Sequence, residues 1–130
     1  MTIPSASDRI IVDSSGWVQY LGNTPKAHRF ALFLESQAML FLPSIVVYEV
    51  YKKISREQPD LVDQFLSQAF GFYDRLIPLT LELAILGSKT SLLTGLPMAD
   101  AIIYATATSI GAKLITSDSH FANLPGVTVV

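Results

Sequence analysis

The sequence predicts an α/β domain in which helices cover both faces of a parallel sheet, a three-layer α/β/α sandwich. Short apolar runs rich in β-branched residues alternate along the chain with longer segments of helical periodicity. Within the short runs the apolar residues are consecutive, which is typical of strands buried on both faces. Half of the residues are apolar and only 15% are charged, a composition that favours a well-filled core.

Five of the apolar runs have the length and composition of buried strands. The first ends at Asp13, directly before a polar segment. We expect the run that contains Pro78 to lie at an edge of the sheet, because proline has no amide hydrogen to donate to a neighbouring strand. The expected strands are Arg9–Val12, Met39–Leu42, Leu76–Leu79, Lys113–Thr116 and Gly126–Val130.

The segments between the strands carry the start and stop signals of helices. Ser14 and Ser15 are suitable caps for the first helix, and Gly22 marks its end. Gly95 and Gly111 end two later helices in the same way. The expected helices run from about Trp17 to Leu21, Pro25 to Gln37, Pro43 to Glu57, Pro59 to Phe72, Thr80 to Leu93 and Pro97 to Ile110.

Length and composition limit the possible functions. At 130 residues the chain is expected to form one domain, residues 1–130. The absence of cysteine excludes disulfides and thiolate zinc sites and fits a cytoplasmic location. The polar first residues do not resemble a signal peptide, and no apolar run is long enough to span a bilayer, so no membrane contact is expected. The net charge of −2 gives no overall attraction for nucleic acid, so a polyanion would need local basic groups or a bound metal.

Four acidic residues, each in or beside an apolar run, give the strongest functional signal: Asp13, Glu49, Asp100 and Asp118. Removing an ionised carboxylate from water costs several kcal/mol even after the protein relaxes. Asp13 and Asp118 follow the ends of predicted strands, where functional groups gather in parallel sheets. If the four acids converge, protons or a divalent cation must relieve their repulsion, and carboxylates favour Mg²⁺ or Mn²⁺.

Each acid also has a purely structural interpretation. Asp13 and Asp118 could cap the helical segments that follow them. Glu49 could pair with Lys53 one helical turn later. Asp100 falls in the first turn of its helix, where the helix dipole favours an acid. This last interpretation is the weakest, because the helix is apolar on most sides and no basic residue stands between positions 92 and 111.

Basic side chains follow Glu49 on its predicted helix. Lys52, Lys53 and Arg56 stand at i+3, i+4 and i+7 from Glu49 and therefore share its face. They could bind substrate phosphates, or they could form a solvated, salt-bridged face.

Other chemistries lack the residues that they require. No Gly-rich nucleotide-binding loop follows a strand, and no G-x-S-x-G turn is present for a hydrolase triad. A phosphotransferase of the haloacid-dehalogenase type would need an aspartate at Ser15. His28 and His120 are too few for a His-rich zinc centre. His28 is expected at the surface, whereas a contact with the site and a surface or capping role are both open for His120.

Four short segments, in order along nearly the whole chain, resemble the motifs of the PIN-domain family. Within that family they are most similar to the small VapC-type toxins of toxin–antitoxin pairs. Each segment contains one of the four acids. The segments are residues 11–15 (IVDSS), 43–49 (PSIVVYE), 96–105 (LPMADAIIYA) and 114–121 (LITSDSHF).

The resemblance implies a Mg²⁺- or Mn²⁺-dependent endoribonuclease with a parallel five-stranded sheet, often a homodimer. Asp13 and Asp100 would be the central metal ligands, and Glu49 and Asp118 would complete the site directly or through water. Metal-activated water would hydrolyse an RNA phosphodiester to 5′-phosphate and 3′-hydroxyl ends, and a cognate antitoxin would hold the protein inactive. The hydroxyls that could assist belong to Ser14, Ser15 and Thr116, while His120 stands where some relatives carry a further acid.

Two other interpretations remain open. The chain could be a non-catalytic PIN-like module that binds RNA or a protein. It could also be a phosphoacceptor domain of flavodoxin-like topology, with Asp13 as the acceptor. Receivers of that kind usually carry a pair of acids near the end of the first strand, and Asp8 is too far from Asp13 in sequence to supply the second.

Overall fold

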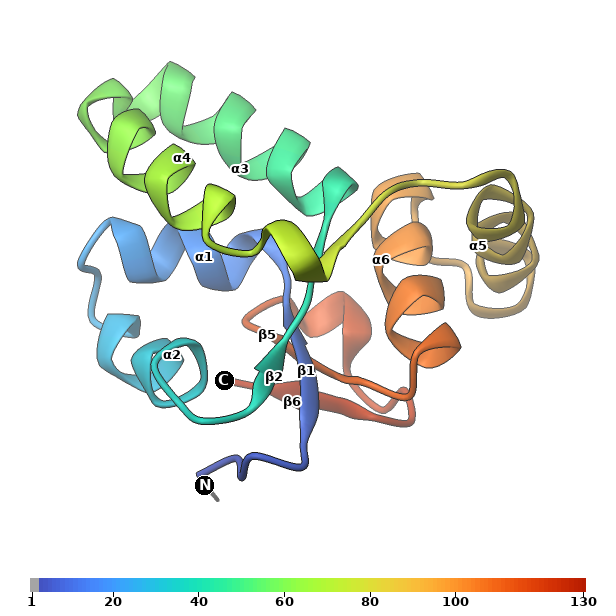
Figure 1. The fold of residues 1–130 in the computed structure, drawn as a ribbon. Coiled ribbons are helices and arrows are strands. Elements are labelled where there is room, and N and C mark those ends of the chain that lie inside the picture. The colour runs from blue at the N-terminus through green and yellow to red at the C-terminus, as the bar shows by residue number, and fades with distance from the viewer. Residues whose placement is uncertain (1–2) are drawn as a thin grey trace.

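The computed structural model describes residues 3–130, except for the side chain of Tyr73, and has the α/β arrangement that the sequence predicts (Figure 1). Its main sheet contains four parallel strands in the order β2-β1-β5-β6. These strands are β1 (Arg9–Val12), β2 (Met39–Leu40), β5 (Lys113–Thr116) and β6 (Val127–Val129). This strand order places β1 and β5 side by side at the centre of the sheet, so the segments that follow them begin at the same edge.

Two further short strands form a separate parallel pair, β3 (Leu42–Pro43) with β4 (Leu76–Ile77). The prediction of a single five-stranded sheet is therefore wrong in the number of strands, because the main sheet has four. The predicted strand over residues 39–42 is divided into β2 and β3, and Phe41 between them donates its amide hydrogen to the Ile10 carbonyl (3.0 Å). Pro43 has no amide hydrogen, so the hydrogen bonds between this segment and β1 cannot continue past it. Pro78 ends β4 for the same reason.

Six α-helices lie within residues 3–130, and all six expected helical segments are confirmed. In the view of Figure 1, the first two lie on one side of the main sheet, the last two on the other, and the middle two above it. The helices are α1 (Ser14–Leu21), α2 (Ala27–Leu34), α3 (Ser44–Glu57), α4 (Val62–Phe70), α5 (Leu81–Thr94) and α6 (Met98–Ser109). Short 3₁₀ turns cover Pro59–Leu61 (η1), Tyr73–Arg75 (η2) and Ser119–Phe121 (η3).

The first helix begins three residues earlier than expected because its cap is Asp13 rather than a serine. The Asp13 side chain accepts a hydrogen bond from the Gly16 amide, which satisfies one of the free donors of the first turn. A residue expected to act in a site thus also starts the helix that follows it.

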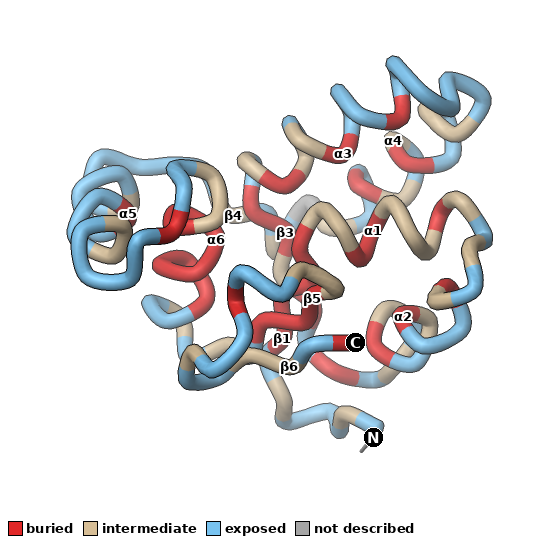
Figure 2. The backbone as a smooth tube through the Cα atoms, turned by 180° about the vertical axis from the view of Figure 1, so that it is seen from behind, coloured by how far each residue is buried: buried red, intermediate tan, exposed pale blue. Residues whose placement is uncertain are grey.

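The central strands are buried on both faces, as their apolar runs predict (Figure 2). Trp17 on α1 extends this core by edge-to-face contacts with Phe65 and Phe72, each with 5.8 Å between ring centroids. These contacts join α4 and the turn after it to α1. Within residues 3–130 no helix has the length and hydropathy that a membrane crossing requires.

Gly16 allows α1 to pack closely against the core. A Cβ atom at this position would lie 2.5 Å from Val12 Cγ1 and 2.7 Å from Phe30 Cε1. We expect Gly16→Ala to lower the free energy of unfolding by about 1–3 kcal/mol, the usual cost of overpacking, in urea denaturation at neutral pH. Gly71→Ala is the matched control, because its Cβ would meet only the Gln68 carbonyl oxygen, at 3.2 Å, and its loss should be smaller. Equal losses for the two variants would contradict this packing account.

Candidate metal centre at the carboxyl edge of the sheet

Asp13 directly follows β1 and is almost completely buried, with 3% of its surface exposed. Both carboxylate oxygens accept hydrogen bonds. Oδ1 accepts from the Ser15 hydroxyl (2.6 Å) and the Gly16 amide (3.1 Å), and Oδ2 accepts from the Thr116 hydroxyl (2.7 Å). The carboxylate is therefore fixed from two neighbouring strands, because Thr116 is the last residue of β5.

The loop after β5 is tied to the same hydroxyls. Thr116 Oγ1 accepts from the Asp118 amide (2.9 Å), and Ser15 Oγ accepts from the Ser117 amide (3.1 Å). Asp118 in turn caps η3 by accepting a hydrogen bond from the His120 amide (2.9 Å). The capping interpretations of Asp13 and Asp118 are thus both correct, and they are compatible with a site because capping fixes each carboxylate beside the other.

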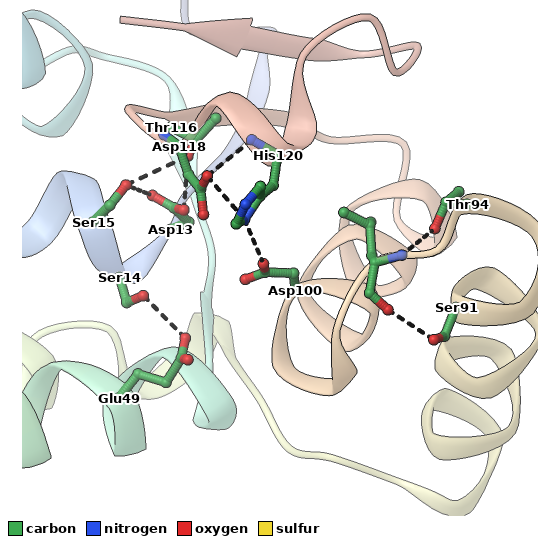
Figure 3. Close-up of polar contacts among 11 residues, drawn as sticks. Asp13, Ser14, Ser15, Glu49, Ser91, Thr94, Asp100, Thr116, Asp118 and His120 are labelled. Carbon is green, nitrogen blue, oxygen red and sulfur yellow. Dashed lines mark hydrogen bonds and ion pairs between the residues drawn. The ribbon is translucent and has the colours of Figure 1, made fainter.

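Asp100 reaches this edge from the first turn of α6, and its side chain is 18% exposed. His120 lies between the two acids, with its Nδ1 atom 4.0 Å from Asp100 Oδ2 and 3.3 Å from Asp118 Oδ1. In the described part of the chain, one ligand atom from each of these three residues lies within 4.8 Å of the other two. Figure 3 shows these side chains facing one another.

His120 is the residue that sequence reasoning left undecided. Its spacing of two residues from Asp118 was the available signal. The 3₁₀ turn η3 brings the imidazole back over the carboxylate that caps that turn. The contact of His120 with the site could not be predicted from spacing alone, because it depends on this turn and on the position of α6.

Glu49 is held at the border of the site. Its Oε1 atom accepts a hydrogen bond from the Ser14 hydroxyl (2.9 Å), which links α3 to the start of α1. The interpretation of Glu49 as a partner of Lys53 is wrong, because the Lys53 ammonium pairs with Glu57 instead (3.4 Å). Asp13 and Glu49 do not belong to the tight group of Asp100, Asp118 and His120, so the acids form a centre with two flanking carboxylates.

The acids are close enough to perturb one another. Burial raises the pKa of the Asp100 carboxyl to about 6, and the charges of Asp118, Glu49 and Asp13 add to this rise, while His120 opposes it. The pKa of Asp13 is also raised, mainly by burial. Hydrogen bonds from Ser15, Thr116 and the Gly16 amide oppose that shift. Without a cation, the ionised forms of Asp13 and Asp100 are thus disfavoured.

A groove lies between α1 and α3. It has a volume of about 460 Å³, and its lining includes Ser14, Ser15 and Glu49. Lys52, Lys53 and Arg56 line its α3 side, so the basic face that the sequence predicts shares a groove with Glu49, one of the two flanking carboxylates. Lys53 and Arg56 lie 3.4 Å and 4.0 Å from Glu57, whereas Lys52 has no ion pair among the described residues.

The donor set fits a hard divalent cation. Carboxylate oxygens and one imidazole nitrogen surround the space between Asp100 and Asp118, and Mg²⁺ and Mn²⁺ prefer such oxygen ligands, with Mn²⁺ the more tolerant of imidazole. Hydroxyl donors orient Asp13 from behind, as supporting residues do for metal ligands.

The raised pKa of Asp100 predicts how the metal-free protein responds to pH. The stabilising contribution of its protonated form is complete below the ordinary pKa of 3.8 and is lost as pH rises through about 6. In chelator at pH 7, Asp100→Asn should therefore raise the free energy of unfolding by about 1 kcal/mol, less than the full shift would give because water reaches this carboxyl.

The gain from Asp100→Asn should shrink as pH falls from 6 toward 4 and disappear below about pH 3, where the wild-type carboxyl is neutral in both states. Urea denaturation at a series of pH values measures this, with Asp60→Asn, at an exposed acid, as the control that should give no gain. A variant less stable than the wild type at pH 7 would contradict the charge repulsion.

Comparisons with known proteins agree with the fold. The family model for the PIN domain matches residues 10–127. No curated protein matches the chain.

Solved structures resemble the chain over most of its length. A toxin–antitoxin complex from Klebsiella pneumoniae superposes with a TM-score of 0.79 at 20% identity, covering 92% of this chain and 96% of the other. VapBC2 from Rickettsia felis, bound to a DNA fragment from its promoter, gives 0.65 at 17% identity and covers 94% and 97%. FitAcB from Neisseria gonorrhoeae gives 0.64 at 21% identity and covers 91% and 95%. At these identities the superpositions show the fold, and the match over residues 10–127 places the chain in the PIN-domain family.

Proposed function

We propose that this chain is a Mg²⁺- or Mn²⁺-dependent endoribonuclease and the toxin of a toxin–antitoxin pair. The observation that carries the proposal is the gathering of Asp13, Asp100 and Asp118 at one edge of the sheet, with Glu49 beside them. Membership of the PIN-domain family supports it. We further propose that residues 1–130 form one domain, that its substrate is RNA, and that it acts in the cytoplasm.

The acids divide into ligands and supports. Asp100 and Asp118 would hold the cation together with His120, since their ligand atoms lie within 4.8 Å of one another. Asp13 would join from its buried position, and Glu49 would join directly or through water. The supporting hydroxyls are those of Ser15 and Thr116 at Asp13 and of Ser14 at Glu49.

A bound divalent cation would supply Lewis-acid chemistry, lowering the pKa of water and offsetting charge on a phosphodiester. The protein's own contribution is to hold several carboxyl groups close together, where their negative charges repel one another when no cation is near. The raised pKa of Asp100, caused by burial and by three neighbouring acids, reflects this repulsion. A bound cation would relieve this repulsion and would be held more tightly for that reason.

The basic side of the groove suits a polyanionic substrate. Lys52, Lys53 and Arg56 would bind RNA phosphates, although the chain as a whole carries a charge of −2. The basic residues share this groove with Glu49, so they could hold the RNA backbone on the α3 side of the metal centre. RNA as the substrate is part of this proposal, and the basic groove supports it.

An antitoxin partner is proposed with the toxin assignment, supported by the resemblance to solved toxin–antitoxin complexes. A homodimer is proposed from a second surface, the α5–α6 apolar surface. Its members are exposed apolar side chains of α5 and of the start of α6: Leu81, Ile85, Leu92, Leu93 and Met98. An exposed apolar surface can pack against its own copy, as a twofold interface requires.

A non-catalytic PIN-like module that binds RNA or a protein is the alternative. It would use the same groove but would not need the acids to converge. The close approach of Asp100, Asp118 and His120, within 4.8 Å, favours the catalytic proposal over this alternative, because a binding module does not need like charges held together.

Metal-dependent cleavage tests the proposed function. Labelled transfer and ribosomal RNAs incubated with Mg²⁺ or Mn²⁺ should be cut, and chelator should stop the reaction. Asp13→Asn and Asp100→Asn should each slow cleavage by at least about 100-fold, since each removes a ligand charge from the cation. Asp60→Asn, at an exposed acid outside the site, should cleave as the wild type does. Cleavage that survives chelation or Asp100→Asn would rule out the metal-dependent reaction.

The oligomeric state tests the α5–α6 apolar surface. Light scattering after size-exclusion chromatography should find a dimer for the wild type. Leu92→Glu should weaken the dimer by at least about tenfold, because it buries a charge in an apolar interface. Phe70→Glu is the matched control, since Phe70 is 73% exposed on α4, outside the surface, and this variant should remain dimeric. A dimer unaffected by Leu92→Glu would exclude this face.

A further inference from the structure

The groove along α1 and α3 extends beyond Glu49 to side chains that the metal centre does not use. Lys52 and Arg56 follow Glu49 on the same face of α3. With a rise of about 1.5 Å per residue, the backbone positions of Lys52 and Arg56 lie about 4.5 and 10.5 Å along the helix axis from Glu49. Positive charge therefore begins about one helical turn beyond Glu49 and continues away from it.

Tyr48 adds a flat apolar surface to the same wall. Its side chain is 61% exposed, and the Lys52 ammonium lies 5.7 Å from the centre of its ring. An exposed tyrosine on a groove wall is available to stack on another ring. The Lys52 ammonium has no ion pair among the described residues and lies over one face of this ring, so the other face is the one on which a base can stack.

We propose that the α1–α3 groove binds a single-stranded RNA segment next to the cleaved bond, with Tyr48 as the residue on which a base stacks. Lys52 then binds the phosphate of that nucleotide, and Arg56 lies farther along the backbone. The inference rests on the proposed ribonuclease function and adds to it the residues, Tyr48 and Lys52, that would position the RNA strand.

The chemistry of the groove favours this occupant over a duplex or a peptide. A base can stack on an aromatic side chain only when it is not stacked within a duplex. This requirement favours single strands, loops and ends. Alternating phosphate and base along a strand matches a wall that presents a cation beside an aromatic ring. The volume of about 460 Å³ lies within the range of about 300–1,000 Å³ of small-ligand sites, which suits a short segment rather than a helix.

Binding in a non-cleaving background tests the inference. The probe is a mixed-sequence single-stranded RNA 12-mer containing 2-aminopurine, titrated with the Asp100→Asn protein. Adding Tyr48→Ala should weaken binding by about tenfold and reduce the quenching of 2-aminopurine, the effect of removing one base–aromatic stack. Tyr48→Phe should retain both the affinity and the quenching, because it keeps the ring.

Tyr51→Ala is the matched control, since Tyr51 is exposed on the same helix and does not line the groove. Lys52→Ala should weaken binding and lower its salt dependence, whereas Lys89→Ala on α5 should not. Unchanged binding by the Tyr48→Ala protein, or equal binding of the duplex form of the probe, would overturn the inference. This binding test needs no cleavage, so it can fail while the metal-dependent reaction is confirmed. It can likewise succeed while that reaction is ruled out.

Discussion

The site depends on the fixed position of Asp13 at the junction of β1 and β5. Hydroxyls from Ser15 and Thr116 donate to its two oxygens, and the same hydroxyls accept the amides of Ser117 and Asp118. Two adjacent parallel strands are thereby joined just beyond their carboxyl ends. Asp118 has little freedom to move away from Asp13, so like charges are held together by the fold itself.

That constraint explains the electrostatics of the other acids. Asp100 enters from α6 into a space already bordered by acids, and its pKa rises to about 6. The PIN-domain match over residues 10–127 disfavours the flavodoxin-like interpretation with Asp13 as a phosphoacceptor. A cation between Asp100 and Asp118 relieves the repulsion without any rearrangement of the strands, and this is the arrangement that we propose.

Much of this could be predicted from the sequence, because strand ends and helix starts are local features. Consecutive apolar residues before Asp13 and the apolar surroundings of Asp100 identified the acids and the α/β class. The division of the 39–42 strand was not predicted, since it depends on where Pro43 and β4 meet in space. The partner of Glu49 was also missed, because Ser14 is 35 positions away and only the packing of α1 on α3 brings them together. His120 needed the turn of η3 for the same reason.

The central claim is that these carboxylates are held together for a divalent cation, and proton release on metal binding tests it most directly. Calorimetric titration of the chelator-treated protein with Mn²⁺ or Mg²⁺ in buffers of different ionisation enthalpy counts the protons displaced. With an Asp100 pKa of about 6, binding at pH 6 should release about half a proton from this residue, and almost none at pH 8. Saturable binding with this pH dependence is the predicted result. Absence of saturable binding, or binding without proton release at pH 6, would contradict the account.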